Sequence, residues 1–244
     1  MIPAMDESPH AFDEAARQGL YRAIFSRRDV RAQFKPDPVP DEVLARLLRA
    51  AHHAPSVGYM QPWSFLLIRD RGVRSRVKAL FDRANAEARA MFEDEQGAAY
   101  ARLKLEGILD SPLNLCITCD PERAGKVVIG RTHIPEMDEY STVCAVMNLW
   151  LAARAEGLGV GWVSILDPQA LKTVLGIPER VIPVAYLCLG SVTHFLDKPE
   201  LETAGWRHRL ALDGLVHLDR WGAEGPDDLL PLLRGEIRHQ TSSS

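Results

Sequence analysis

Several features are scarce or missing in this 244-residue sequence, and each absence excludes a class of protein. No stretch approaches the roughly 18 consecutive apolar residues of a membrane-spanning helix. Basic residues (29) are fewer than acidic ones (33) and interspersed with them, so no basic face indicates nucleic-acid binding. The N-terminal residues lack a positively charged region followed by an apolar run, so no secretory signal is expected. We therefore expect a cytoplasmic protein.

Cysteine is also scarce, with four residues in the chain. Cys116 and Cys119 form a C-x-x-C, but in a β-like run an odd separation turns two side chains to opposite faces. No second pair and no spaced pair of histidines follows. The sequence therefore predicts buried core thiols and no metal site.

The remaining composition is that of a globular protein, with 46% hydrophobic and 25% charged residues. We see no internal repeat and no linker long enough to separate domains. Helical segments outnumber the strands scattered among them, which predicts a single α+β domain over residues 1–244. Residues 1–11 and 236–244 are expected to be flexible tails.

Hydrophobic periodicity places the elements along the chain. A first helix ends near residue 26, and a second begins with Asp41 as its N-cap. Residues 73–109 should be mostly helical with a break at Gly97, and a short helix should open at Pro168. A long helix at 137–156 should be stopped by Gly157 and Gly159. Strands are expected at 64–68 (fully buried), 113–118, 160–165 and 182–189, with one more short candidate beyond Trp206.

The helix at 137–156 is apolar over more than one stripe. A helix of that kind must be covered all round, and a subunit interface would cover it. We therefore expect a homodimer.

An unusual density of charge follows the first helix, where residues 27–31 read Arg-Arg-Asp-Val-Arg. Guanidinium groups match phosphate oxygens bidentately, so three arginines this close indicate a bound phosphate. Asp29 would repel a phosphate, so it either pairs with an arginine or serves different chemistry. A solvated charged turn is the alternative interpretation.

Three blocks in this order resemble the nitroreductase family of FMN-binding proteins: R-R-x-x-R at 27–31, A-P-S-x-x-x-x-Q-P-W at 54–63, and G-L-G-x-x-W-x-x-x-x-D-P at 157–168. The resemblance covers roughly residues 20 to 215. It implies a mixed central sheet flanked by helices, in an intertwined homodimer with FMN in two clefts at the interface.

The resemblance also assigns roles to individual positions. It implies that an N-terminal and a C-terminal basic cluster grip the ribityl phosphate, and that a loop of the partner subunit lies against the flavin. These positions are Arg27, Arg28 and Arg31, then Arg207 and Arg209, and finally Pro55, Ser56 and Gln61. Gly58 lets the backbone approach the isoalloxazine, or only serves the turn. A surface ion-pair patch is the alternative for Arg207 and Arg209.

Two positions depart from ordinary members of the family. Asp29 stands where those enzymes usually carry Ser or Thr, and Ser164 where they tend to have glycine. Reduced FMN is an anion, so an unpaired carboxylate beside it would have a raised pKa, which suits a group that must accept a proton. Ser164 would hydrogen-bond the flavin near its reactive centre. We predict that both are catalytic.

Both departures resemble a branch of the family that consumes its own flavin. That resemblance implies O₂-dependent fragmentation of FMNH₂ to 5,6-dimethylbenzimidazole, the lower ligand of cobalamin, and erythrose 4-phosphate. FMNH₂ and O₂ would be the substrates, and an external flavin reductase would supply the FMNH₂. Met91 and Phe92 are candidates for a lid over the flavin, or plain apolar residues of a helix.

Two other functions fit the same residues. An FMN-dependent NAD(P)H nitroreductase or dehalogenase would keep its flavin and accept hydride from a nicotinamide. A non-catalytic flavin-binding protein would explain the arginines and the dimer, but not a carboxylate beside an anion.

Overall fold

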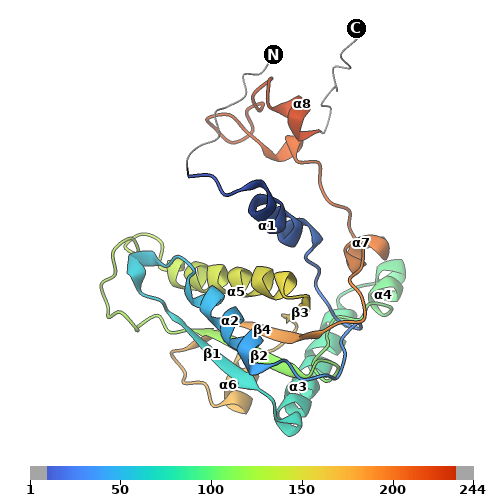
Figure 1. The fold of residues 1–244 in the computed structure, drawn as a ribbon. Helices are drawn as coiled ribbons and strands as arrows, with labels where there is room; N and C mark the ends of the chain where they lie inside the picture. Colours follow the sequence, from blue (N-terminus) through green and yellow to red (C-terminus); the bar gives the residue numbers. More distant parts are fainter. Residues whose placement is uncertain (1–9, 235–244) are drawn as a thin grey trace. The chain divides into compact units, whose positions relative to one another are not determined.

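The computed structural model describes residues 10–234. The expected tail at 236–244, and residues 1–9 of the one expected at 1–11, therefore lie outside the described residues. The chain divides into two compact units, the first ending at Glu200 and the second beginning at Leu201. The first unit contains the sheet (Figure 1). Each unit is described below by itself.

Four strands form the sheet of the first unit, in the order β1-β2-β4-β3. They are β1 (Trp63–Ile68), β2 (Leu113–Cys119), β3 (Leu158–Val163) and β4 (Ile182–Ser191). The α+β class is confirmed, and one feature of the expected mixed sheet is corrected. All three strand pairings are antiparallel, and within residues 10–234 parallel pairing is confined to an isolated bridge between Asp29 and Val160.

Helices cover both faces of this sheet (Figure 1). The first face carries α2 (Asp41–His52) and α5 (Met137–Ala155), whose apolar residues pack with Leu115, Ile117 and Leu187. The opposite face carries α3 (Arg71–Ala90) and α6 (Pro168–Leu175), whose apolar residues pack with Cys116 and Cys188. Successive side chains of β2 and β4 point to opposite faces of the sheet and therefore contribute to two separate hydrophobic cores.

Helix α1 (Glu14–Ser26) packs against α5 and is capped by Asp13, which accepts a hydrogen bond of 2.8 Å from the Ala16 N–H. The first turn of α2 differs from expectation. Pro40 is its N-cap, without a side-chain hydrogen bond, and Asp41 is the first helical residue. Asp41 thus contributes charge at the positive end of the helix rather than a cap.

Four other expectations about elements need correction. Strand β1 is only partly buried, since Leu67 is exposed on its outer side. The helical break falls at residues 91–93, and Gly97 lies inside α4 (Asp94–Tyr100), while residues 101–109 are not helical. Gly157 ends α5 with a φ of 77°, but Gly159 already belongs to β3. Among residues 207–234 no strand is found.

The long helix α5 is already covered within the protomer. Every side chain from residue 141 to residue 154 is at least partly buried, against the sheet, α2 and α1. A central position in the protomer therefore accounts for much of its apolar character, and the expected homodimer stays a prediction.

The expected core thiols are confirmed. All four cysteines are free, and Cys116, Cys119 and Cys188 are buried. Burial raises the pKa of Cys116 and Cys188 to about 12 and that of Cys119 to about 11. These thiols stay protonated at neutral pH and carry no chemistry.

The second unit contains little regular structure: the end of α7 (Glu200–Thr203), the 3₁₀ turn η2 (Asp213–Leu215) and α8 (Leu230–Leu233). An ion pair of 2.7 Å between Arg234 and Asp213 links its last and middle segments. Among the helices of residues 10–234, none is both long and apolar enough to cross a membrane.

Candidate functional site

The arginine-rich segment that follows α1 is built onto the edge of the sheet. The Val30 N–H donates to the carbonyl of Val160 at 2.9 Å, which extends β3, an edge strand, by one short parallel pairing. The segment at 29–31 can lie this close to β3 only because position 161 of the strand is a glycine. A Cβ atom added to Gly161 would lie 2.1 Å from the Val30 carbonyl oxygen. The sequence therefore fixes residues 29–31 against the end of β3.

Asp29 is held at this edge by two hydrogen bonds. Its Oδ1 accepts from the backbone N–H of Trp162 at 3.0 Å, and its Oδ2 accepts from Nη2 of Arg31 at 3.0 Å. The side chain remains 33% exposed. Burial raises the pKa of Asp29, against the opposing effect of the Arg31 charge and the Trp162 hydrogen bond. A positioned carboxyl group with a raised pKa is suited to accept a proton.

Of the two alternatives for Asp29, pairing with an arginine is the one observed, and the partner is Arg31. The Arg31 side chain is 10% exposed and also lies 3.5 Å from Oε2 of Glu200. Arg31 was expected to hold phosphate together with Arg27 and Arg28. In the structure, its guanidinium contacts the carboxylates of Asp29 and Glu200.

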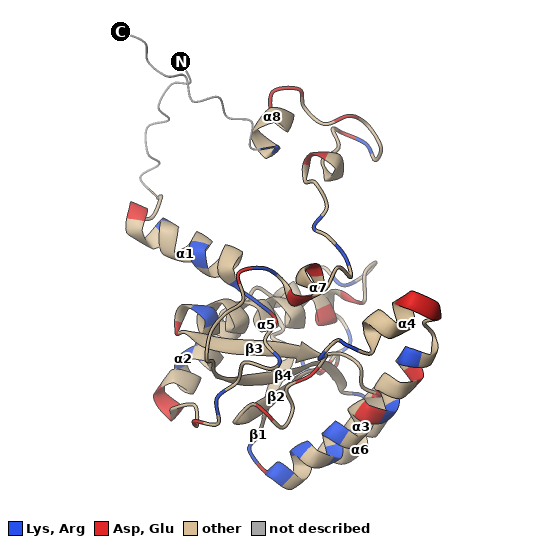
Figure 2. Ribbon diagram, turned by 90° about the vertical axis from the view of Figure 1, so that its right-hand side faces the viewer, with Lys and Arg blue, Asp and Glu red and all other residues tan. Residues whose placement is uncertain are grey.

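Positive charge gathers at the other end of the segment. Arg27 stacks over the ring of Trp150 at 4.7 Å, and Arg154 over the ring of Phe195 at 4.1 Å. Arg154 also donates from Nε to the carbonyl of Ser26 at 3.3 Å. Burial and the neighbouring charges of Arg22 and Arg28 lower the pKa of Arg154. Figure 2 shows basic residues along α1 and the segment that leaves it.

Arg28 is the most constrained member of this cluster. Its terminal nitrogens donate to the carbonyls of Phe25, Arg27 and Asp197, while its Nε is buried without a partner. An orphaned buried donor among like charges fits an anion such as phosphate. Sequence reasoning found Arg27 and Arg28 but missed Arg154, which lies on α5 and is brought near only by folding.

Ser164 directly follows the last residue of β3 and is exposed. Trp162, whose N–H binds Asp29, lies two residues before it. The two residues predicted to be catalytic therefore both lie near the C-terminal end of β3.

The loop after α2 has an unusual backbone. Gly58, Tyr59 and Gln61 have φ values of 53°, 55° and 47°, in the left-handed region. Ser56 stabilises this conformation, because its Oγ accepts from the Gln61 N–H at 3.1 Å. Pro55 and Gly58 are exposed. A Cβ atom at Gly58 would lie 2.5 Å from Val128, so within the protomer this glycine makes room for the chain rather than for a ligand.

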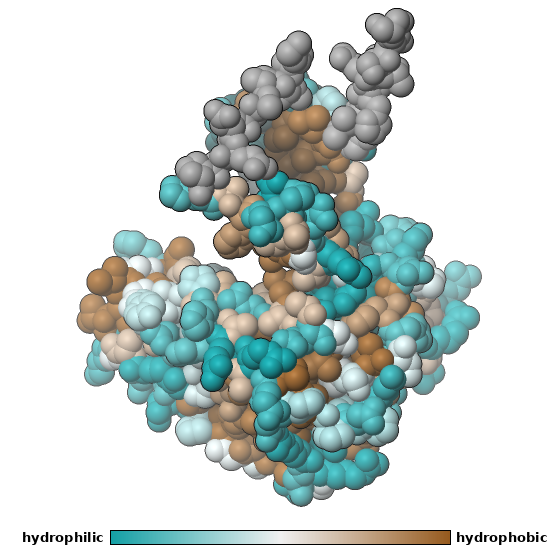
Figure 3. Space-filling model, in the orientation of Figure 1, coloured by the Kyte–Doolittle hydropathy of each residue, from teal (hydrophilic) through white to brown (hydrophobic). Residues whose placement is uncertain are grey.

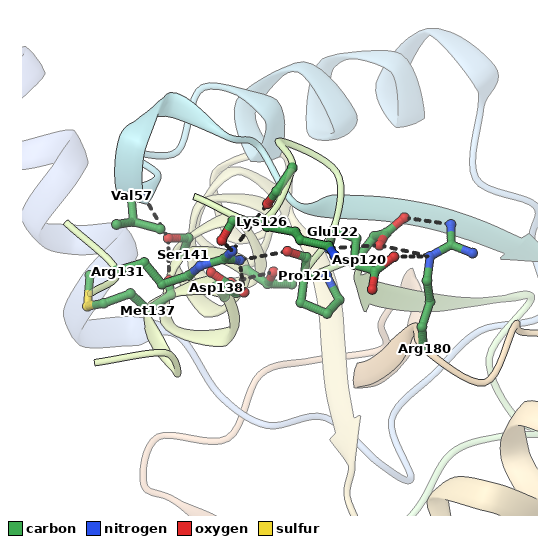
Figure 4. Close-up of polar contacts among 12 residues, drawn as sticks. Val57, Asp120, Pro121, Glu122, Lys126, Arg131, Met137, Asp138, Ser141 and Arg180 are labelled. Carbon is green, nitrogen blue, oxygen red and sulfur yellow. Dashed lines mark hydrogen bonds and ion pairs between the residues drawn. The ribbon is translucent and has the colours of Figure 1, made fainter. Parts of the chain in front are cut away.

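A second carboxylate–guanidinium pair supports the loop that follows β2, and it was missed at the level of sequence (Figure 4). Arg131 binds Asp138 at 2.8 Å and also donates to the carbonyls of Pro121, Gly125 and Lys126. One turn along α5, the Ser141 Oγ accepts from the Val57 N–H at 3.0 Å. Residues 120–131 and the loop at 54–63 are thereby both tied to the start of α5.

The surface over this loop is apolar. Figure 3 shows hydrophobic surface at the left edge, where residues 121–136 lie. The exposed side chains there include Tyr59, Val127, Ile129 and Ile134, with Val127 93% exposed. An open groove of about 560 Å³ runs alongside, lined by charged residues that include Asp138 and Arg131.

The remaining predicted residues lie elsewhere. Met91 caps the end of α3 and is 80% exposed, and Phe92 stacks on Tyr100 at 5.0 Å. Arg207 and Arg209 belong to the second unit and are exposed, so they are not placed relative to Arg27. Within residues 10–234, no group of three or more His, Cys, Asp or Glu side chains is arranged to hold a metal ion.

Curated proteins are similar in sequence to most of this chain. A 5,6-dimethylbenzimidazole synthase of Rhodospirillum rubrum is 47% identical over 198 residues, covering 81% of this chain and 93% of the relative. A protein of the same name from Rhodobacter capsulatus is 40% identical over 199 residues, covering 82% and 96%. These relatives confirm the expectation of an enzyme and a resemblance to proteins named 5,6-dimethylbenzimidazole synthase.

Solved structures confirm the fold alone, because identity to them is low. An iodotyrosine deiodinase bound to FMN and 3-iodo-L-tyrosine matches with a TM-score of 0.64 at 19% identity, covering 84% of this chain and 99% of that one. A nitroreductase family protein of Clostridium novyi NT matches with a TM-score of 0.55 at 22% identity, covering 84% and 96%. The family model for nitroreductases matches residues 24–191. The chain belongs to the nitroreductase family.

Proposed function

We propose that this chain fragments reduced FMN with O₂, giving 5,6-dimethylbenzimidazole, the lower ligand of cobalamin, and erythrose 4-phosphate. The observation that carries the proposal is Asp29, a carboxyl group with a raised pKa that is fixed at the end of β3. The relatives named 5,6-dimethylbenzimidazole synthase support the same reaction.

The residues present fit FMNH₂ as the substrate. Arg27 and Arg28 would hold its phosphate, with Arg154 as a further cation and Arg207 and Arg209 contributed by the C-terminal unit. The support is the gathered positive charge and the orphaned Nε of Arg28. We propose that the 244 residues act as one nitroreductase-like domain in an intertwined homodimer.

The dimer would complete the site. Pro55, Ser56, Gly58 and Gln61 would lie against the flavin bound by the partner subunit. The exposed apolar residues over this loop, among them Val127, support an interface there, since such a patch is rarely left in water.

Within the site, Asp29 would take a proton from the bound substrate, at the ribityl C1′ next to the ring nitrogen. Ser164, two residues beyond the Trp162 N–H that positions Asp29, would hydrogen-bond the flavin and steer the reaction. Met91 and Phe92 would close over the flavin and exclude water. An external flavin reductase would supply FMNH₂, because this chain would accept little hydride directly from a nicotinamide.

One assay tests the function. The protein is mixed with FMNH₂ under air, and 5,6-dimethylbenzimidazole is measured by mass spectrometry. Product in excess of a protein-free control is expected. Reduction of bound FMN by NADPH in stopped flow, without the benzimidazole, would favour a nitroreductase or dehalogenase. Tight FMN binding without either reaction would favour a flavin-binding protein.

A further inference from the structure

The carboxylate of Glu200 reaches the catalytic candidate through Arg31. Arg31 directs Nη2 to Asp29 at 3.0 Å and Nη1 to Glu200 at 3.5 Å. Glu200 is the first residue of α7, 169 positions after Arg31 in the chain, and its side chain is 26% exposed. One arginine therefore serves two carboxylates.

This sharing limits what Arg31 can do for Asp29. A guanidinium can bind one carboxylate through two parallel N–H donors, and that bidentate contact stabilises the ionised form most. Here Asp29 receives one amino group of Arg31, while the other faces Glu200. The Glu200 charge also offsets part of the Arg31 charge.

The groups that face Asp29 are few. They are the charges of Arg31, Arg27 and Glu200, and the N–H of Trp162. Cys188, on β4, interacts with Asp29 as well, but burial keeps its thiol protonated. Burial is the main cause of the raised pKa of Asp29, and Glu200 is the acidic side chain among these groups that adds to it.

We propose that Glu200 is a positioning residue that keeps Asp29 basic by competing with it for Arg31. The role in catalysis rests on the proposed function, whereas the competition for Arg31 does not require the flavin. Without Glu200, Arg31 would turn both amino groups to Asp29 and hold it ionised, which would make it a weaker proton acceptor.

The test is a titration of Asp29 in flavin-free protein, by NMR of ¹³C-labelled aspartate carboxyls. The Asp29 signal is assigned by its loss in Asp29→Asn. In Glu200→Gln we expect the Asp29 midpoint to move to lower pH. Glu202→Gln is the matched control, since Glu202 lies on the same short helix and makes no ion pair with the described residues. An unchanged midpoint in Glu200→Gln, or an equal shift in Glu202→Gln, overturns the proposal.

A second variant and an activity measurement complete the test. Glu200→Asp keeps the charge but withdraws it by one methylene from Arg31, so a smaller downward shift is expected, and thermal unfolding shows that each variant is folded. In the benzimidazole assay, the acidic limb of the pH profile should also move down in Glu200→Gln. If no variant forms product but the titration shifts as expected, the proposed function fails and the role of Glu200 stands.

Discussion

Two carboxylate–guanidinium pairs in this protein use the same residue types for different ends. The side chains of Asp138 and Arg131 are 6% and 14% exposed. Arg131 also donates hydrogen bonds to three backbone carbonyls. Asp29 is 33% exposed, and its partner Arg31 is shared with a second carboxylate. The first pair fixes a loop. The second leaves a carboxyl group reachable and poorly neutralised, which is a condition for proton transfer.

The largest effect should come from Asp29→Asn, which keeps the Oδ1 acceptor for Trp162 but removes the proton-accepting charge. Benzimidazole formation should fall by about a hundredfold or more, as expected for loss of a general base. FMN binding, measured by quenching of flavin fluorescence, should be nearly unchanged. Normal product yield would remove Asp29 from the mechanism and leave the two pairs alike.

The converse substitution, Asp138→Asn, should cost stability rather than catalysis. It leaves the largely buried Arg131 guanidinium without its counter-charge, and because loss of one partner of a fully buried pair typically destabilises by about 3–5 kcal/mol, the cost here should approach that range. Urea denaturation measures the change.

Asp82→Asn serves as the control for Asp138→Asn. It breaks a largely exposed ion pair with Lys78 and should cost no more than about 1 kcal/mol. An equal loss of unfolding free energy in the two variants would show that the Asp138–Arg131 pair stabilises the fold no more than an exposed ion pair does.

Ser164 follows β3, the strand to which Asp29 is hydrogen-bonded, so its substitution tests the Asp29 site alone. Ser164→Gly removes one hydroxyl from the end of β3. A lost hydrogen bond of about 1 kcal/mol predicts a roughly fivefold slower formation of product, with more of the O₂ appearing as hydrogen peroxide. The benzimidazole-to-peroxide ratio is the measurement, and an unchanged ratio contradicts the assignment.

The smallest effect concerns pH and stability. The pKa of Asp29 is raised in the folded state above the ordinary value of 3.8. Its contribution to folding is therefore fully present below that value and is lost as pH rises through the raised pKa. Relative to the Asp29→Asn variant, the free energy of unfolding of the native chain should therefore decrease as the pH rises above the ordinary pKa of 3.8. Denaturant titrations at several pH values measure the free energy of unfolding of both proteins. If the native chain becomes more stable relative to Asp29→Asn as the pH rises, the prediction is wrong.

Much of the fold and the site could be predicted from the sequence. Periodicity located α1, α2, α5 and the four strands, because burial on one face leaves a regular apolar pattern. The dense arginines and the adjacent carboxylate indicated an anion site. Predictions failed where local pattern does not decide. Gly97 is tolerated inside α4, and the stretch at 101–109, which carries Arg102, Lys104 and Glu106 among apolar residues, is not helical once its neighbours pack.

The sequence by itself determined the local elements and the residue types of the site. It also determined where glycine leaves room, as at Gly161 beside the Val30 carbonyl. Only the tertiary structure decided which charges meet. It set Arg31 between Asp29 and Glu200, and brought Arg154 to Arg27 and Arg28. The contact of Arg31 with Glu200 spans 169 positions, and that of Arg154 with Ser26 spans 128. The burial that raises the pKa of Asp29 likewise arises only once the chain has closed around it.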